Sequence, residues 1–244
     1  MARIFITGSA DGLGQLSARS LVDQGHQVVL HARNVARGGE AIRKVPGAET
    51  VLTGDLSDIE ETKKLAHAAN QSGTFDVIIH NAGVYQAPST NIFAVNILAP
   101  YILTCLIEKP ERLIYLSSGM HLQGRFKPDS FNSDADRITY ADSKLHVLLL
   151  CMAVARKWSQ VCCNAVDPGW VPTKMGGRGA PDDLQKGCET QVWLAVSNDE
   201  EAKVSGRYFF HKKERHHNPE ASVVMLQEKF LNLCGKITGV SFPR

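Results

Sequence analysis

The chain lacks the features that mark several classes of protein. Its 27 lysines and arginines nearly balance 25 aspartates and glutamates, giving a net charge of +2, and like charges form no long block. A nucleic-acid-binding surface is usually strongly basic, so we expect no nucleic-acid partner. The first residues, MARIFITG, show no charged region followed by an apolar stretch and a cleavage site, so we expect no signal peptide.

Long apolar runs and paired cysteine motifs are also missing. The longest apolar run, residues 147–155, is too short to span a bilayer, so we expect no membrane span. The six cysteines have no CxxC spacing, and we interpret them as buried reduced thiols rather than metal ligands or disulfides. This usage indicates a cytoplasmic location. The most basic stretch, HKKERHH at 211–217, is interpreted as a solvated loop, with an anion or partner site as the alternative.

What the chain does contain is a regular alternation of short β-branched runs and helical stretches. The predicted strands are 3–7, 27–32, 50–53, 75–80, 112–117, 161–166 and 207–210. The predicted helices are 13–24, 35–44, 58–71, 92–107, 139–158, 182–196 and 220–233. Apolar strands separated by helices predict an α/β fold: a single doubly wound Rossmann-type domain over 1–244, with a parallel seven-stranded sheet and helices on both faces. Ligands of such sheets bind beyond the carboxyl ends of the strands.

A glycine-rich turn, ITGSADGLGQL, joins the first predicted strand to the first helix. Gly8, Gly12 and Gly14 allow a phosphate to approach the main chain, and the start of the helix presents unpaired amides to that anion. The spacing is not GxGxxG, and no Lys-Ser/Thr pair follows, which argues against a nucleotide-triphosphate loop. A tight turn that only packs helix against sheet is the alternative.

The end of the second predicted strand bears on the choice of cofactor. An acidic residue there usually holds a free ribose 2′-hydroxyl, but this chain has Ala32 followed by Arg33. A guanidinium suits a 2′-phosphate. We therefore predict that NADP(H) is preferred over NAD(H), with Arg33 and Ser9 at the extra phosphate, although Asp11 adds a nearby negative charge.

Tyr140 and Lys144 stand four residues apart at the start of a predicted helix, so their side chains share one face. A phenol needs about 4 kcal/mol to ionise at neutral pH, and an ammonium about 4 Å away supplies roughly that much at an effective dielectric constant near 20. The pair can therefore act as a general acid/base. A helix whose exposed turn merely carries both residues is the structural alternative.

Six motifs occur in the order found in one enzyme family. They are TGSADGLG (7–14), NAG (81–83), Asn96 in VNILAP, YLSS (115–118), YADSK (140–144) and DPGWVPT (167–173). On these motifs the chain resembles the short-chain dehydrogenases/reductases of the shorter, roughly 250-residue type, over nearly its whole length. The resemblance implies a Rossmann-type fold and hydride transfer between a nicotinamide cofactor and an alcohol/carbonyl pair.

The resemblance also implies roles for individual residues. Tyr140 would exchange the proton with the substrate oxygen, and Lys144 would lower its pKa and bind the nicotinamide ribose. Ser118, with Ser117 as the fallback, would hydrogen-bond the substrate oxygen, and Asn96 would hold a water that links Lys144 to solvent. The implied cofactor-binding residues are Gly8, Ser9, Gly12, Leu13, Gly14, Arg33, Asp55, Leu56, Asn81, Ala82, Gly83, Tyr140, Lys144, Pro168, Gly169, Val171 and Thr173. Taken singly, Asn96, Asp55 and Pro168–Gly169 could instead be helix-capping, helix-kinking or strand-ending residues.

Three segments depart from or elaborate the family pattern. The stretch from 84 to 95 is unusually short, which leaves the placement of Asn96 and the subunit contacts open. Residues 119–139 are expected to form a loop at the mouth of the site, where His121, Leu122 and Phe126 are candidate pocket residues, with a structural loop histidine as the alternative for His121. Residues 170–183, with Trp170 and Met175, are expected to be mobile and to close over cofactor and substrate.

The apolar character of these segments resembles the carbonyl-reductase and retinol-dehydrogenase-like branches and indicates a medium-sized apolar aldehyde, ketone or alcohol. The partners expected are this small molecule and further copies of the chain in a homodimer or homotetramer. A catalytically silent NADP(H)-binding regulator or scaffold is the alternative, which the full set of four catalytic residues disfavours. A sugar-nucleotide epimerase or dehydratase is disfavoured because the C-terminal region is too small.

Overall fold

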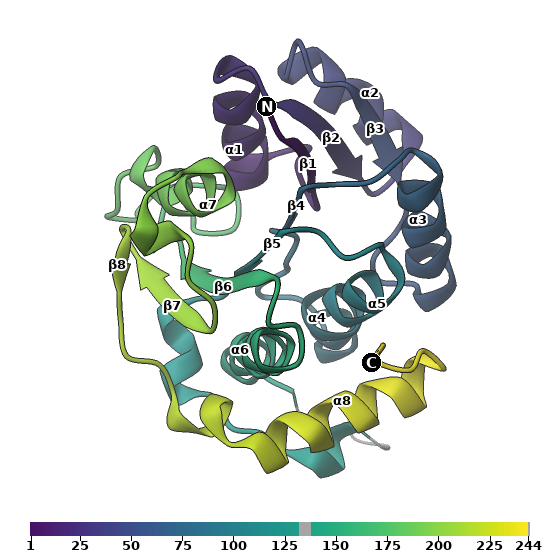
Figure 1. Ribbon diagram of the computed structural model, residues 1–244, viewed down its shortest axis with the longest axis vertical. Coiled ribbons are helices and arrows are strands. Elements are labelled where there is room, and N and C mark those ends of the chain that lie inside the picture. The colour runs from purple at the N-terminus through teal and green to yellow at the C-terminus, as the bar shows by residue number, and fades with distance from the viewer. Residues whose placement is uncertain (132–137, 244) are drawn as a thin grey trace.

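The computed structural model describes residues 1–131 and 138–243, and all of its described strands join one sheet. The strands are β1 (Arg3–Ile6), β2 (Gln27–Ala32), β3 (Thr50–Thr53), β4 (Val77–His80), β5 (Arg112–Leu116), β6 (Cys162–Asp167), β7 (Arg207–Phe210) and β8 (Lys213–Glu214). Their order is β3-β2-β1-β4-β5-β6-β7-β8, and only the β7–β8 pair is antiparallel. The predicted Rossmann-type fold is confirmed, with an eighth strand added to the seven expected (Figure 1).

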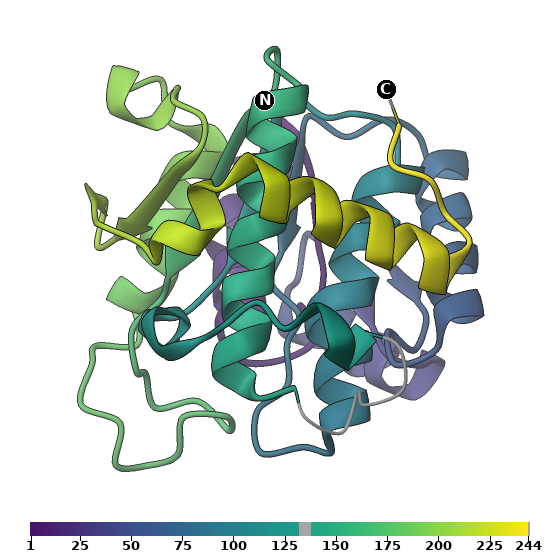
Figure 2. The same cartoon turned by 90° about the horizontal axis from the view of Figure 1, so that it is seen from below.

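Helices cover both faces of the sheet (Figure 1). They are α1 (Gly12–Asp23), α2 (Val35–Lys44), α3 (Ile59–Gln71), α4 (Ser89–Phe93), α5 (Ala99–Leu106), α6 (Tyr140–Lys157), α7 (Lys186–Val196) and α8 (Val224–Thr238). The helices α1, α2 and α7 pack on one face, while α3, α5 and α6 pack on the other. The last helix, α8, crosses the outer side of α6 (Figure 2).

The alternation of side chains along each strand explains this two-sided core. In β1, Phe5 points into the cluster under α3, α5 and α6, whereas Ile4 and Ile6 point into the cluster under α1, α2 and α7. Successive residues of a strand face opposite sides of the sheet, so a strand buried on both faces must be apolar throughout. That is why the continuous apolar runs of the sequence predicted a parallel sheet correctly.

The predicted helix at 92–107 proves to be three consecutive pieces. It begins in α4, passes through one π-helical turn at Ala94–Leu98 and continues as α5. Ser89–Leu106 is apolar and long enough to resemble a membrane-crossing helix, but two-thirds of it is buried within the fold, as in a core helix. Asn96 lies in the π-turn, and such turns often occur at functional sites.

The sheet order reverses between β1 and β4, which places a crevice at their carboxyl ends. β1 runs on through Thr7 to Gly8, and β4 runs on to Asn81. The Asn81 side chain donates to the backbone oxygens of Thr7 (2.9 Å) and Gly8 (3.2 Å), tying the two strand ends together. This switch point is where doubly wound sheets bind ligands.

Candidate active site

A long pocket runs along the carboxyl ends of the strands, from the glycine turn to the start of α6. Most residues implied for the cofactor line it: Gly8, Gly12, Leu13, Arg33, Asp55, Leu56, Asn81, Ala82, Gly83, Tyr140, Lys144, Pro168 and Thr173. Gly12, with a φ of 54°, borders the pocket, and a Cβ there would meet only the Thr173 side chain at 3.6 Å. The glycine turn therefore leaves its backbone open to a ligand, as an extended dinucleotide requires.

Not every implied residue faces this pocket. The Ser9 side chain is fully buried; its hydroxyl donates to the Ile6 carbonyl (2.9 Å) and accepts from the His31 amide (2.8 Å). It cannot hold a 2′-phosphate as predicted. Gly14 serves packing instead, since a Cβ there would come within 2.4 Å of the Asn81 side chain. Both residues shape the turn from inside.

Two more basic residues than the sequence indicated border the end of the pocket beside Arg33, and acidic partners accompany them, including Glu40, which pairs with Arg37 at 2.6 Å. Arg37, on α2, and Lys174, from the 170–183 segment, also line it. Both form ion pairs with Asp11, and the hydrogen bond from Lys174 is the main cause that lowers the pKa of the Asp11 carboxyl. The negative charge of Asp11, which argued against a 2′-phosphate, is thereby paired. Arg37 and Lys174 were missed because they lie outside the family motifs.

The pair at the start of α6 faces the other end of the same pocket. A capping box positions it: the Thr139 hydroxyl accepts from the Asp142 amide (3.1 Å), and the Asp142 carboxylate accepts from the Thr139 amide (3.1 Å). Lys144 is buried and donates to the Leu116 carbonyl at 2.8 Å, with its ammonium 5.4 Å from the centre of the Tyr140 ring. The two side chains share one face of the helix, as their spacing predicts.

The pKa shifts of this pair differ from the sequence-based expectation. Burial raises the pKa of Tyr140, the negative charge of Asp167 raises it further, and a hydrogen bond with Ser118 opposes both. Burial lowers the pKa of Lys144 to about 8. The ammonium is directed at the Leu116 carbonyl rather than at the phenol oxygen, so it does not overcome the burial of Tyr140 in the protein alone. Tyr140 is therefore held as a neutral phenol.

The two candidate serines are now distinguished. Ser118 hydrogen-bonds Tyr140 and lines the adjoining pocket described below. Ser117 is buried and donates to the Lys144 carbonyl at 3.0 Å, which holds β5 against α6. Of the two, Ser118, the first choice, is the one that contacts Tyr140; its role at a substrate oxygen stays a prediction.

Asn96 lies close to this pair despite the shortened segment before it. Its Oδ1 accepts from the Val84 amide (2.8 Å), and its Nδ2 donates to the Val84 carbonyl (3.0 Å) and to the Ser143 hydroxyl (3.0 Å). A Cβ at Gly83 would come within 3.4 Å of both Asn96 Oδ1 and Lys144 Nζ. The role of Asn96 in holding a water stays a prediction.

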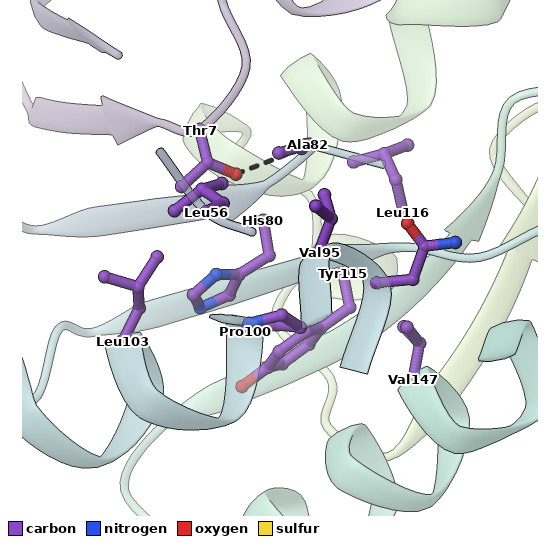
Figure 3. Close-up of a pocket in the computed structure, with 11 residues that line it drawn as sticks. Thr7, Leu56, His80, Ala82, Val95, Pro100, Leu103, Tyr115, Leu116 and Val147 are labelled. Atoms are coloured by element: carbon purple, nitrogen blue, oxygen red, sulfur yellow. Dashed lines mark hydrogen bonds between the residues drawn. The ribbon is translucent and has the colours of Figure 1, made fainter. Parts of the chain in front are cut away.

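A small interior pocket lies behind the cofactor pocket and shares Leu56, Ala82, Val95 and Leu116 with it (Figure 3). The Thr7 hydroxyl accepts from the Ala82 amide at 3.0 Å, which fixes the strand end above it. The His80 ring stacks on Tyr115 with their centres 4.7 Å apart, and burial lowers the pKa of His80 to about 3. His80 is therefore neutral, and sequence reasoning gave no sign of it.

A second large pocket adjoins the first at Tyr140 and Ser117. Four large apolar side chains that are exposed to solvent line it: Tyr85, Met120, Trp170 and Met175. Tyr85 meets the Tyr140 ring edge-on, with centres 4.8 Å apart. Phe210 and Asp167, at the ends of neighbouring strands, complete the wall. Trp170 and Met175 were predicted here; Tyr85, Phe210 and Asp167 were not.

His121 does not line either pocket. Its side chain is fully buried, its Nδ1 lies 2.6 Å from the Ser118 carbonyl oxygen, and its ring meets Tyr208 edge-on. The structural alternative for this histidine is therefore correct, and the substrate role is wrong. Phe126 packs in the core, and Leu122 is exposed. Residues 132–137 of the same predicted loop lie outside the described part of the chain.

Residues 170–183 form an irregular segment over the junction of the two pockets. The Trp170 indole donates to the Gly176 carbonyl (2.8 Å), and the Trp170 amide donates to the Asp182 carboxylate (2.6 Å). Val171 is buried, and its carbonyl accepts from the Thr173 amide at 2.7 Å. The mobility predicted for this segment stays a prediction.

Comparison with known proteins identifies relatives along the whole chain. A family model described as short chain dehydrogenase matches residues 2–126. An uncharacterized oxidoreductase of Emericella nidulans is 44% identical over 256 residues, covering 100% of this chain and 99% of its own. The short-chain dehydrogenase chyC of Penicillium rubens is 44% identical over 258 residues, covering 100% of both chains.

Solved structures share the fold at lower identity. An uncharacterized protein from Mycobacterium paratuberculosis superposes with a TM-score of 0.85 at 22% identity, covering 100% of this chain and 96% of that one. A short-chain dehydrogenase from Shigella flexneri, complexed with NADP, has a TM-score of 0.67 at 21% identity and covers 87% of this chain and 97% of its own.

Proposed function

Because this chain belongs to the short-chain dehydrogenase family, we propose that it is an NADP(H)-dependent oxidoreductase acting on the carbonyl or alcohol carbon of a medium-sized apolar substrate. One observation carries the proposal. Tyr140 lies where the long pocket from the glycine turn meets the apolar pocket, and Ser118 and Lys144 flank it. A carbonyl oxygen between Ser118 and Tyr140 would therefore have its carbon facing the cofactor pocket.

The residues of this junction have separable tasks. When bound, the dinucleotide supplies or accepts the hydride. The Ser118 and Tyr140 hydroxyls hydrogen-bond the substrate oxygen, and in reduction Tyr140 gives up its proton to that oxygen. Lys144, held by the Leu116 carbonyl, supplies a buried positive charge that favours the phenolate formed. Because burial and Asp167 keep Tyr140 protonated, the free protein is prepared for proton donation, which supports the reductive direction.

The preference for NADP(H) rests on the positive charge at the adenosine end of the pocket. Arg33, Arg37 and Lys174 border it, and the pairing of Asp11 with Lys174 and Arg37 reduces repulsion of a 2′-phosphate. Guanidinium groups match phosphate oxygens in two-pronged contacts. The NADP found in the related Shigella flexneri protein is compatible with this assignment.

The apolar substrate class rests on the second pocket. Met120, Trp170 and Met175 are 38%, 60% and 44% exposed, which is unusual for large apolar side chains gathered in one place. Such a cluster marks a surface that a ligand covers. We further propose that residues 1–244 form a single domain. We also propose that the protein is cytoplasmic and assembles as a homodimer or homotetramer.

Measuring turnover distinguishes the proposed oxidoreductase from the alternative, a catalytically silent NADP(H)-binding regulator. Oxidation of NADPH should be followed in the presence of a panel of aromatic and aliphatic ketones and aldehydes. We expect turnover in the wild type and a loss of at least about a thousandfold in kcat for Tyr140→Phe, with cofactor affinity kept, since the proton donor alone is removed. Tyr101→Phe is the matched control, because the Tyr101 hydroxyl donates to the Val240 carbonyl far from the site.

Near-normal turnover in Tyr140→Phe would exclude this tyrosine as the acid/base. Binding of NADPH without turnover of any ketone or aldehyde would favour the regulator.

A further inference from the structure

A carboxylate stands in the wall of the substrate pocket, near the aromatic and methionine side chains that gather there. Asp167 is the last residue of β6, beside Phe210 of β7, and its half-buried side chain lines the pocket together with Ser118 and Tyr140. Its negative charge acts on both Tyr140 and Lys144, so it lies near the reacting centre. A charged group placed among aromatic and methionine side chains calls for a partner.

The hydrogen bonds within the protein leave this carboxylate with spare capacity. Oδ1 accepts from the Gly169 amide at 2.9 Å, and Oδ2 accepts from the Tyr208 hydroxyl at 3.1 Å. An ionised carboxylate offers about four acceptor positions, so about two stay open. The two hydrogen bonds fix the orientation of the carboxylate and leave acceptor positions for a ligand.

No cation of the described chain lies within ion-pair distance of Asp167, although its charge acts on Lys144 from farther away. Among residues 1–131 and 138–243, no lysine, arginine or histidine forms an ion pair with it. Lys174 lines the same pocket but is paired with Asp11. The other carboxylate of the pocket, Asp182, accepts from the Trp170 amide. The pocket therefore presents two carboxylates, and Asp167 is the one whose charge acts on Tyr140.

Gly119 keeps the carboxylate accessible from the side of Ser118. A Cβ at position 119 would come within 3.0 Å of Asp167 Oδ2, closer than nearly all real contacts of a Cβ. Any side chain there would crowd or cover this oxygen. With glycine, this oxygen is not crowded from position 119, and it stays in the pocket that Ser118 and Tyr140 also line.

We propose that Asp167 determines substrate specificity: the substrate carries a hydroxyl or amine donor next to its reacting carbonyl, and this carboxylate accepts the hydrogen bond. The proposal rests on the proposed oxidoreductase function and narrows its substrate class. A polar site rejects an analogue that lacks the matching donor much more strongly than an apolar pocket rejects an extra methyl group. A purely structural role, holding Gly169 and Tyr208, is the alternative.

The test compares probes of nearly equal shape. 2-Hydroxy-1-phenylethanone has a donor next to its carbonyl, 1-phenylpropan-1-one has a methyl group in its place, and 2-oxo-2-phenylacetate has an anion. Affinity is measured by calorimetry in the presence of NADP⁺, where the ketones are not reduced, and kcat/KM is measured separately with NADPH. We expect the wild type to bind the hydroxyketone at least about tenfold more tightly than the methyl analogue, as one hydrogen bond to a charged group allows.

Asp167→Asn removes the charge and keeps an oxygen for Gly169. It should reduce the hydroxyketone preference to about threefold or less and should bind the anionic probe about fivefold or more tightly than the wild type does. Tyr208→Phe, which removes one structural hydrogen bond and keeps the charge, should retain the preference. Gly119→Ala, which crowds Oδ2, is the second variant and should lower the preference with the carboxylate still present.

An unchanged hydroxyketone preference in folded Asp167→Asn, equal affinity of the wild type for both neutral ketones, or no affinity for any probe would overturn the proposal. Preferential binding with no NADPH oxidation would uphold the assignment of Asp167 and contradict the proposed function instead. Turnover of ketones with no preference for a hydrogen-bond donor would uphold the proposed function and contradict the assignment of Asp167.

Discussion

Opposing influences act on the pKa of Tyr140, and their balance decides whether it is a phenol or a phenolate. Burial and the charge of Asp167 raise this pKa, and the hydrogen bond with Ser118 lowers it. The ammonium of Lys144 is held 5.4 Å from the ring centre by the Leu116 carbonyl. Lys144, with a pKa of about 8, is still mostly charged at pH 7. Tyr140 is thus a phenol in the free protein, and alcohol oxidation should require a higher pH than carbonyl reduction.

The proposed preference for NADP(H) predicts a direct effect of Arg33. We expect Arg33→Ala to raise the KM for NADPH about tenfold and to change that for NADH about twofold or less, since only the 2′-phosphate contact is lost. Steady-state kinetics with both cofactors measures this. Arg43→Ala, at the exposed end of α2, is the control and should change neither value. A wild type that prefers NADH tenfold would contradict the assignment.

Single residues also show where sequence reasoning reaches its limit. The motifs predicted that Tyr140, Lys144 and Ser118 lie near one another, and the structure places them around two adjoining pockets, because their spacing on a helix and at a strand end fixes them. Ser9 and His121 look like ligand residues in the sequence, yet the side chain of each is buried and hydrogen-bonds a backbone carbonyl inside the fold. Tyr85 and Asp167 join the site through tertiary packing, which no local pattern reports.

The first turn of α6 links the stability of that helix to catalysis. We expect Thr139→Ala to lower the free energy of unfolding by about 1 kcal/mol, the usual value of a helix cap, and to lower kcat more than it changes the KM for NADPH. The reason is that fraying of this turn displaces Tyr140 directly. Denaturant unfolding and steady-state kinetics provide the two measurements.

Thr139→Ser keeps the hydroxyl and should restore both the stability and the kcat. If Thr139→Ala lost stability but kept the wild-type kcat, the cap would not be positioning Tyr140.

The 170–183 segment is tied to the glycine turn through the Lys174–Asp11 ion pair. We expect NADPH to slow tryptic cleavage at Lys174 and Arg178 about fivefold or more, because the bound cofactor would hold this segment closed. Limited proteolysis followed by mass spectrometry measures it. Arg215, in the exposed stretch after β8, is the internal control and should be cut at the same rate with and without NADPH. Equal cleavage of 170–183 under both conditions would argue against closure.

Element boundaries show a similar division between local and tertiary causes. The strands 27–32, 50–53 and 207–210 were predicted to the residue, since their apolar runs end in turns. The π-turn at Ala94–Leu98 was not predicted; Asn96 within it bonds to Val84 and Ser143, which are contacts between segments that no local pattern reports. The helix predicted at 220–233 begins at Val224, after a short 3₁₀ turn at Pro219–Ser222.

At the scale of the whole molecule, the parallel sheet followed from the alternation of apolar runs and helical stretches, but its edge did not. The central strands β1, β4 and β5 are apolar and almost wholly buried, and this pattern is readable in the sequence, whereas the edge strand β3 is only partly buried. The eighth, Lys213–Glu214, is polar and exposed; it pairs with β7 through the backbone ladder and an exposed ion pair between Glu214 and Arg207 at 3.1 Å. The stretch 211–217 was predicted to be a solvated loop; it is largely exposed, but it also closes one edge of the sheet.

Three buried histidines make the stability of the whole fold sensitive to acid. Burial lowers the pKa of His31 to about 4, of His80 to about 3 and of His146 to about 4. Each folded-state pKa lies below the ordinary value of about 6.5, so the unfolded chain takes up the protons first. Their contribution to stability is therefore complete above about pH 6.5 and is lost as the pH falls toward 4.

His146 provides the sharpest test of this effect. It stacks on Phe230 with ring centres 5.7 Å apart, lies edge-on to Phe126 and Phe131, and neither ring nitrogen has a hydrogen-bond partner among the described residues. A phenyl ring suits this apolar cluster better than an imidazole. We expect His146→Phe to reduce the stability difference between pH 7.5 and pH 5 by about 2 kcal/mol, measured by urea unfolding. His67→Gln, on the exposed side of α3, should leave that difference unchanged, and an unchanged difference in His146→Phe would show that His146 is not buried as a neutral ring.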